Sequence, residues 1–236
     1  MAIDVSRIRA LCFDVDGTLR DTDDQWVERL ANVLHPIEFV FPGRDYRRYA
    51  RRLVMGADDP VNMAMHLTDR LGLDNLAARM FSRSAPDRPP RLTRTPPTMI
   101  AGVREMLLRL REHYPMAVVS ARDEHGTRTF LDGHALTPYF KVIVTGQTCQ
   151  FTKPFPDPVE HAAREMGVPA QACLMIGDTI VDILSGKAAG AQTVGVLCGF
   201  GDENELRQRG ADLILSSTAL VADVLLGSTS ESSIPD

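Results

Sequence analysis

The sequence predicts an α/β fold: a doubly wound, mainly parallel, Rossmann-like sheet forms the core, and an α-helical cap domain is inserted into it. Short apolar runs that end at a polar residue recur along the chain, which is typical of buried parallel strands. From about residue 98 onward these runs alternate with helical patterns, as a doubly wound sheet requires. A long stretch of helical patterns separates the first strand from the second, and this stretch is the predicted cap.

Three of the predicted strands end at side chains that can take part in chemistry. In an open α/β sheet, ligands gather at the carboxyl ends of the strands, so residues far apart in sequence can meet there. We therefore expect Asp14, Ser120 and Asp178 to share one crevice. The three runs, with the residues that follow them, are 10–13 with Asp14, 116–119 with Ser120, and 173–176 with Gly177 and Asp178.

The other elements of the core follow from periodicity and from helix-start signals. A helix is expected over residues 100–110, whose apolar side chains recur at helical spacing. A second helix is expected to start with Asp157 as its N-cap and Pro158 at its first position, which leaves Lys153 on the loop before it. Further strands are expected at residues 141–144, 192–197 and 212–215.

The chain divides into a core, a cap and a tail. We expect residues 1–21 and 96–226 to form the α/β core and residues 22–95 to form the helical cap. A segment rich in proline and arginine, residues 84–91, is interpreted as the linker that leads back to the core. The serine-rich residues 227–236 are expected to be a disordered tail.

The composition is that of an ordinary globular enzyme. The 236 residues are 44% hydrophobic and 24% charged, and the net charge of −5 argues against partners such as nucleic acid or an anionic membrane. The chain has no hydrophobic signal region at its start and no apolar run of about 18 residues that would span a membrane. Its four cysteines are widely spaced, which favours free thiols. We expect a cytoplasmic monomer or homodimer.

The acidic residues fit phosphoryl transfer through a covalent intermediate. A carboxylate that attacks phosphorus divides one difficult hydrolysis into two easier steps, and Asp14 is the candidate nucleophile. Asp16, just beyond the strand end, is the candidate acid/base: it would protonate the leaving-group oxygen and later take a proton from water. Gly17 allows a sharp turn that brings the backbone close to the phosphate.

Clustered carboxylates beside a phosphate repel one another unless a cation lies between them. Oxygen ligands with room for water and a substrate phosphate favour Mg²⁺, and Asp14 and Asp178 are the candidate side-chain ligands. Lys153 is expected to neutralise charge on the transferring phosphoryl group, and the Ser120 hydroxyl to donate to one of its oxygens. Further phosphate contacts are expected from the backbone N–H groups of Thr18 and Ala121. The side chain of Arg122 fits a phosphate contact and an exposed loop position equally well.

Together the four motifs resemble those of the haloacid dehalogenase superfamily of aspartyl-phosphate hydrolases. In that family, DxDGT follows the first strand, a Ser or Thr follows a later strand, and a Lys and a GDxxxD motif come next. The arrangement is most similar to that of the phosphoglycolate phosphatase-like members. The matching residues are Asp14 to Thr18, Ser120, Lys153, and Gly177 to Asp182.

The resemblance implies a Mg²⁺-dependent phosphatase that hydrolyses a small organic phosphate monoester through an aspartyl-phosphate. It implies that Mg²⁺ is bound by the Asp14 carboxylate, the Asp16 backbone carbonyl and Asp178, with Asp182 supporting the site. It also implies a cap that closes over the active site and selects the substrate. The expected partner is then a small phosphorylated molecule, without nucleic acid or membrane.

Several alternatives stay open at this level. A phosphomutase of the same family shares the first half-reaction, and a catalytically idle member would bind a metabolite or a partner through its cap. Taken alone, Asp178 is also compatible with a role as the cap of the next helix. Lys153 taken alone is also compatible with a solvent-exposed lysine. DxDG also occurs in calcium loops, but the later acidic positions and the closing Glu are not in place here. Dehalogenation is disfavoured because the resembling dehalogenases lack the second aspartate that Asp16 supplies.

Overall fold

The computed structural model of the chain describes residues 3–21 and 98–227. The predicted helical cap, residues 22–95, lies outside the described residues, and so do residues 228–236 of the predicted tail. In the part that is described, no helix is long and apolar enough to cross a membrane.

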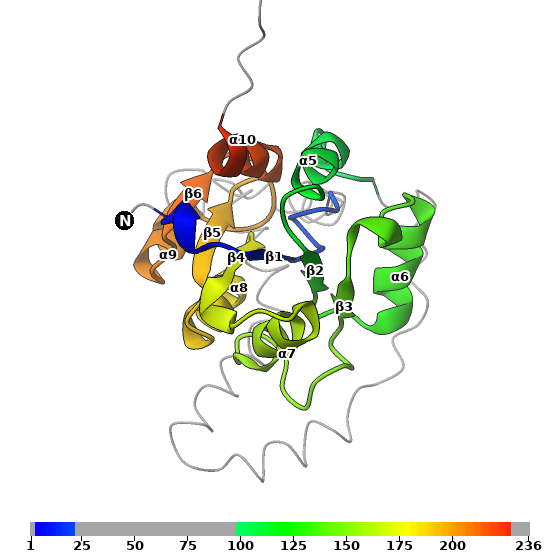
Figure 1. The fold of residues 1–236 in the computed structure, drawn as a ribbon, viewed down its shortest axis with the longest axis horizontal. Coiled ribbons are helices and arrows are strands. Elements are labelled where there is room, and N and C mark those ends of the chain that lie inside the picture. The colour runs from blue at the N-terminus through cyan, green and yellow to red at the C-terminus, as the bar shows by residue number, and fades with distance from the viewer. Residues whose placement is uncertain (1–2, 22–97, 228–236) are drawn as a thin grey trace, which may run out of the picture. The chain divides into compact units, whose positions relative to one another are not determined.

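A six-stranded parallel sheet forms the centre of the core, which confirms the predicted fold class (Figure 1). Each strand is short and rich in apolar residues, as expected for strands covered on both faces. The strand order is β3-β2-β1-β4-β5-β6. The strands are β1 Ala10–Phe13, β2 Met116–Val119, β3 Val142–Val144, β4 Cys173–Gly177, β5 Gln192–Val196 and β6 Leu213–Leu215.

Helices follow the strands in alternation and cover both faces of the sheet. The α-helices are α5 Val103–Leu110, α6 Glu124–Gly133, α7 Asp157–Met166, α8 Ile180–Ala188, α9 Glu203–Gln208 and α10 Val221–Leu226. Short 3-10 turns are η1 Val5–Arg7, η4 Thr137–Tyr139, η5 Ala170–Ala172 and η6 Thr218–Leu220.

Alternate side chains of β1 point to two separate hydrophobic clusters. Leu11 and Phe13 pack in the larger cluster, which also contains the buried residues of α5 and α10. Ala10 and Cys12 pack in the second cluster, which also contains Val159, Ala162, Ala163 and Met166 of α7. In Figure 1, α5 and α10 accordingly lie on the opposite side of the sheet from α7 and α8. The period of two along a strand thus produces two buried faces and a doubly wound core.

The start of α7 differs from the sequence-based expectation. Asp157 was expected to be the N-cap, but the helix begins at Asp157, and Pro156 takes the N-cap position without a side-chain cap hydrogen bond. Pro156 already has helical dihedral angles, with φ −70° and ψ −24°, so the turn starts one residue early. Pro158 is still accommodated, because N–H groups in the first turn have no intrahelical acceptor.

The switch point of the sheet lies between β1 and β4, where the strand order reverses direction. The chain leaves the core just after β1 and comes back before α5 through two segments that are hydrogen-bonded to each other. Asp21 N–H donates to Thr98 O at 2.8 Å, and Ile100 N–H donates to Leu19 O at 3.0 Å. The described segments on either side of residues 22–97 are therefore joined by backbone hydrogen bonds.

Candidate active site

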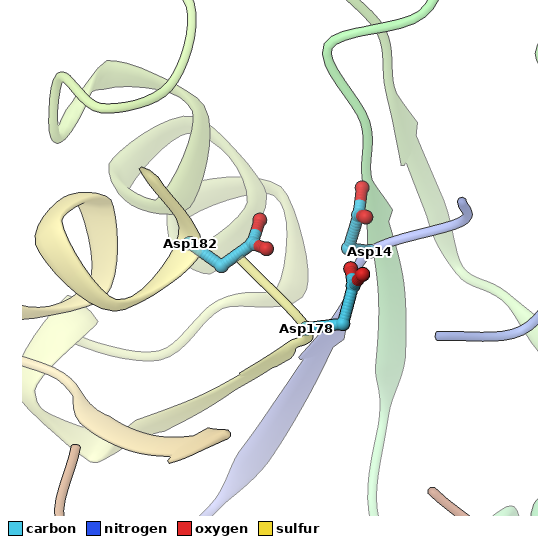
Figure 2. Close-up of side chains that lie close together, drawn as sticks. All are labelled: Asp14, Asp178 and Asp182. Atoms are coloured by element: carbon cyan, nitrogen blue, oxygen red, sulfur yellow. The ribbon is translucent and has the colours of Figure 1, made fainter. Parts of the chain in front are cut away.

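Three buried carboxyl groups converge at the carboxyl ends of the central strands. Asp14 follows β1, Asp178 follows β4, and Asp182 lies in the first turn of α8. Each offers an oxygen that lies within 4.8 Å of those of the other two, and Figure 2 shows the three side chains approaching one another. The exposed fraction is 6% for Asp14 and 0% for Asp178 and Asp182. The predicted meeting of Asp14 and Asp178 at one edge of the sheet is present in the structure.

Lys153 joins this cluster from the loop before α7. Its Nζ lies 2.6 Å from Oδ1 of Asp14 and 2.6 Å from Oδ1 of Asp182, and the side chain is 3% exposed. The simpler interpretation of Lys153 as a solvated lysine is therefore wrong. One ammonium group faces three carboxyl groups, so full ionisation would leave an excess of negative charge in a place that water barely reaches.

This excess of charge appears in the proton affinities. Burial raises the pKa of Asp14 to about 7; the carboxyl groups of Asp182 and Asp16 add to the rise, and the ammonium of Lys153 opposes it. Burial, with Asp182 and Asp14 nearby, also raises the pKa of Asp178 well above its usual range. Burial lowers the pKa of Lys153, but the carboxylates of Asp14 and Asp182 outweigh it and hold that pKa above the usual range.

The donor set fits a divalent cation. Oxygen atoms of Asp14 and Asp178 lie close together, and burial and the neighbouring carboxyl groups raise the pKa of both, an effect that a bound cation would oppose. A small, hard cation such as Mg²⁺ prefers carboxylate oxygens and keeps water in its remaining positions. Asp14 and Asp178 are the two residues best placed to hold it.

Two glycines leave room for the Asp178 carboxylate. Gly17 has a φ of +78°, and a Cβ atom added there would lie 2.1 Å from Oδ2 of Asp178. A Cβ atom at Gly199 would come equally close to the same oxygen. Phe200 N–H donates to this oxygen at 2.7 Å and fixes the orientation of the carboxylate. The sharp turn expected at Gly17 is present. In this structure the turn brings the backbone at Gly17 close to the carboxylate of Asp178.

Asp182 is bound by its own helix and by Lys153. Its Oδ2 accepts from the N–H of Thr179 at 3.0 Å and from the Thr179 hydroxyl at 2.6 Å, which is part of a capping box at the start of α8. Its Oδ1 accepts from Lys153. Both oxygens thus have protein donors, and the described contacts make Asp182 a residue that orients Lys153. Its support of a metal stays a prediction.

Asp16 lies between two arginines, a relationship that sequence reasoning missed. Arg122 donates through Nε to Oδ2 at 2.9 Å and through Nη2 to Oδ1 at 2.8 Å, and Arg20 Nη1 lies 2.9 Å from Oδ1. Burial works to raise the pKa of Asp16, but Arg122 and Arg20 more than offset it and hold that pKa below its usual range. In this arrangement Asp16 is held in the ionised carboxylate form. The only sequence signal was the spacing of four residues between Asp16 and Arg20.

The residues predicted to contact phosphate lie at the same end of the sheet. Ser120 follows β2, and its Oγ accepts from Arg122 N–H at 3.1 Å. Ala121 comes next in the chain and is exposed. The N–H of Thr18 donates to Val15 O at 3.3 Å, so in this structure that amide is part of the turn after β1. Contacts of these residues with phosphate stay predictions.

Comparison with known proteins agrees with this geometry. The model of the haloacid dehalogenase-like hydrolase family matches residues 11–196. The chain is 29% identical over 237 residues to a phosphoglycolate phosphatase from Pectobacterium atrosepticum, covering 98% of each chain. It is 27% identical over 221 residues to pyrophosphatase PpaX from Halalkalibacterium halodurans, covering 92% of this chain and 97% of the relative. A solved hydrolase from Pseudomonas syringae is similar with a TM-score of 0.60 and 25% identity, covering 89% of this chain and 94% of the other.

Proposed function

Because the chain belongs to the haloacid dehalogenase-like hydrolases, we propose that it is a Mg²⁺-dependent phosphatase acting on a small organic phosphate monoester. The observation that carries this proposal is the convergence of Asp14, Lys153 and Asp178 at the switch point of the sheet. A buried carboxylate, a buried ammonium group and a cation-binding pair are the three groups that phosphoryl transfer to an aspartate needs.

In the first half-reaction, an oxygen of Asp14 attacks the phosphorus of the substrate. The bond between phosphorus and the leaving-group oxygen breaks, and Asp16 supplies the proton that this oxygen takes up. The products are the free alcohol and a phosphoryl group bound to Asp14. Before this step Asp16 must gain a proton, so its pKa, which Arg122 and Arg20 hold below the usual range in this structure, must be higher when the phosphate of the substrate is beside it.

In the second half-reaction, water attacks the phosphorus of the aspartyl-phosphate. Asp16 takes a proton from that water, the bond between phosphorus and Asp14 breaks, and inorganic phosphate leaves. The contacts of Asp16 with two guanidinium groups keep it in the carboxylate form that a base must have, and they also lower its affinity for the proton.

The remaining residues stabilise charge on the transferring group. Lys153 Nζ lies 2.6 Å from Asp14 Oδ1, so it would stabilise charge on a phosphoryl group bound there. The Ser120 hydroxyl, whose oxygen accepts from Arg122 N–H, would donate to one oxygen of that group. When bound by Asp14, Asp178 and the Asp16 carbonyl, Mg²⁺ would supply positive charge that lowers the repulsion between nucleophile and phosphate. Gly17, Thr18 and Ala121 complete the proposed phosphate surroundings.

The relatives suggest two substrates to test first. Similarity to a phosphoglycolate phosphatase over nearly the whole chain favours a small phosphorylated acid. Similarity to a pyrophosphatase favours inorganic pyrophosphate as a second candidate, because the same attack on phosphorus cleaves a phosphoanhydride. A phosphomutase would share the first half-reaction but return the phosphoryl group to a substrate hydroxyl.

The test is phosphate release from 2-phosphoglycolate, pyrophosphate, several sugar phosphates and p-nitrophenyl phosphate, with Mg²⁺ and with EDTA. We expect Mg²⁺-dependent release by the wild type, loss of release in Asp14→Asn, and retention in Asp223→Asn, a matched change at a half-exposed ion pair. If Asp14→Asn released phosphate at the wild-type rate, the covalent mechanism through Asp14 would be wrong. Release from none of the esters would favour a mutase or an idle binding protein.

A further inference from the structure

We propose that Arg122 is a positioning residue that fixes the orientation of the Asp16 carboxylate, and that Gly126 provides the space in which the Arg122 side chain lies. The inference rests on the proposed function, because it assumes that Asp16 is the acid/base. It assigns to Arg122 an action through Asp16, in place of the direct phosphate contact considered from the sequence.

The contact between the two side chains is a two-point contact. Arg122 Nε donates to one carboxylate oxygen of Asp16 at 2.9 Å, and Nη2 donates to the other at 2.8 Å. Two parallel hydrogen bonds between planar groups fix the plane of the carboxylate, which a single contact does not. Arg20 adds a third donor at 2.9 Å. The Asp16 side chain is still 27% exposed, so it is held without being sealed off.

The backbone of Arg122 is itself fixed on both sides. Its N–H donates to Ser120 Oγ at 3.1 Å, and its carbonyl accepts from Gly146 N–H at 2.8 Å. A Cβ atom at Gly146 would lie 2.5 Å from the Ala121 carbonyl, so a larger residue there would push these two loops apart. The starting point of the Arg122 side chain is thus set by the loops after β2 and β3.

The path of the side chain runs across the first turns of α6. A Cβ atom at Gly126 would lie 2.9 Å from Cδ of Arg122, 3.2 Å from Cγ and 3.3 Å from Nη1. Glycine is a poor helix former, and here its missing side chain leaves the room that Arg122 occupies. Gly133, the last residue of the same helix, has nothing within 4 Å of its added Cβ atom. These two glycines are therefore a matched pair for substitution.

Orientation matters because an acid/base acts only within hydrogen-bond reach of the proton that it moves. If the Asp16 carboxyl group rotates away from the leaving-group oxygen, it cannot protonate that oxygen. The reaction then slows for substrates whose leaving group is a strongly basic alkoxide. Substrates with an acidic leaving group, such as p-nitrophenol, need no proton in that step. Arg122 should therefore influence the two kinds of substrate differently, which a residue with a merely structural role would not do.

The first experiment compares Arg122→Met and Arg122→Lys with the wild type on an alkyl phosphate and on p-nitrophenyl phosphate. We expect kcat/KM, which depends only on the steps up to formation of the aspartyl-phosphate, to fall about tenfold to a hundredfold for the alkyl substrate in Arg122→Met, with a change of about threefold or less for the aryl substrate. Lysine keeps the charge without the two-point contact and should restore only part of the loss. Arg128→Gln, at an exposed ion pair on α6, is the control and should match the wild type.

The second experiment places Arg122→Met in the Asp16→Asn background. If Arg122 acts through Asp16, the double variant should have the same kinetic parameters as Asp16→Asn within about twofold, since residues that act as one unit are not additive. A direct phosphate contact by Arg122 predicts the opposite: a raised KM for both substrates, with the same loss in both backgrounds. That result would overturn the inference.

The third experiment uses substitutions that remove no charged side chain and that are expected to leave the protein folded. Gly126→Ala should leave thermal stability unchanged or raised, because alanine favours helix, yet reduce alkyl phosphate turnover by displacing Arg122. Gly133→Ala should leave turnover unchanged. Equal turnover of both glycine variants on the alkyl substrate would contradict the role of Gly126. A wild type without any Mg²⁺-dependent hydrolysis refutes the proposed function, whereas an active wild type with no leaving-group effect in Arg122→Met refutes this inference alone.

Discussion

The ammonium group of Lys153 lies 2.6 Å from Oδ1 of Asp14 in a site where the lysine side chain is 3% exposed. A second carboxylate, that of Asp182, is equally close on the Lys153 ammonium. Lys153 is thus bound to the proposed nucleophile before any phosphate arrives. The pair links the stability of the core to the proposed chemistry of the site, because the same charge stabilises the folded chain and would face the phosphoryl group.

Replacement of this charge should cost both stability and activity. In Lys153→Met, two buried carboxyl groups lose their ammonium partner, and breaking a buried pair typically costs about 3–5 kcal/mol. We expect the free energy of unfolding to fall by about that amount and kcat to fall at least about a hundredfold. Urea denaturation and phosphate release measure the two effects.

Lys187→Met is the matched control. Lys187 Nζ also lies 2.6 Å from a carboxylate oxygen, that of Asp212, but its side chain is 36% exposed. Surface pairs contribute about 0–1 kcal/mol, so this variant should be nearly as stable as the wild type and fully active. If Lys153→Met kept its turnover, Lys153 would have no part in the reaction.

A divalent cation should stabilise the folded chain through Asp178. Binding only to the folded state adds about 2.7 kcal/mol at a hundredfold excess over Kd, which in a chain of this size raises Tm by about 5 °C or more. Asp178→Asn should be at least as stable as the wild type in EDTA, because a buried charge is removed while Phe200 N–H keeps an acceptor. The variant should show no rise in Tm with MgCl₂. An equal rise in both proteins would exclude Asp178 as a ligand.

The metal-free protein should also lose stability as pH rises, through Asp14. The pKa of this carboxyl is raised from 3.8 to about 7 by burial, so between these values the folded state holds a proton that the unfolded state has lost. The contribution of Asp14 to the free energy of unfolding then decreases from about pH 4 to pH 7 and is constant above that range. Asp14→Asn does not ionise and lacks this decrease.

Denaturation in EDTA at several pH values isolates the effect. The difference in free energy of unfolding between Asp14→Asn and the wild type should grow in favour of the variant as pH rises from 5 to 8. A difference that does not depend on pH would mean that the folded state leaves the proton affinity of Asp14 at its ordinary value.

The strand ends were predictable because the local pattern is strong. Parallel strands buried on both faces are apolar throughout, so Asp14 and Asp178 stand out as the first polar side chains after each run. No boundary of the described strands differs from expectation by more than one residue; β6, for example, starts at Leu213 rather than at residue 212. Because both residues follow strands of one parallel sheet, they were expected to lie together at the carboxyl edge of that sheet.

The arginines around Asp16 were not predictable, because their contacts depend on the path of long side chains. Arg122 and Asp16 are 106 residues apart, and their meeting requires the space over Gly126. From the sequence alone, Arg122 appeared equally suited to a phosphate or to solvent. The proposed cap residues lie outside the described part of the chain, so their role in substrate choice stays a prediction.

Gly17 offers a test that separates backbone strain from crowding of the metal site. Its φ of +78° is in the left-handed region, and a side chain there would also meet Oδ2 of Asp178 at 2.1 Å. Gly167 has a similar φ of +80° with nothing within 4 Å of its added Cβ atom. In both Gly17→Ala and Gly167→Ala, the cost of a left-handed backbone at alanine should lower the free energy of unfolding by about 1–2 kcal/mol.

Only in Gly17→Ala should the free energy of unfolding fall by more than this amount. Only this variant should lose Mg²⁺ binding and phosphatase activity. The added methyl group displaces the Asp178 carboxylate, so the rise of Tm with MgCl₂ should disappear along with Mg²⁺-dependent phosphate release. Gly167→Ala, which ends α7 away from these carboxylates, should keep both despite its lower stability. Thermal unfolding with and without MgCl₂, run beside phosphate release, distinguishes the two. Retention of the Mg²⁺ effect in Gly17→Ala would show that the contact between Gly17 and Asp178 does not set the position of the carboxylate.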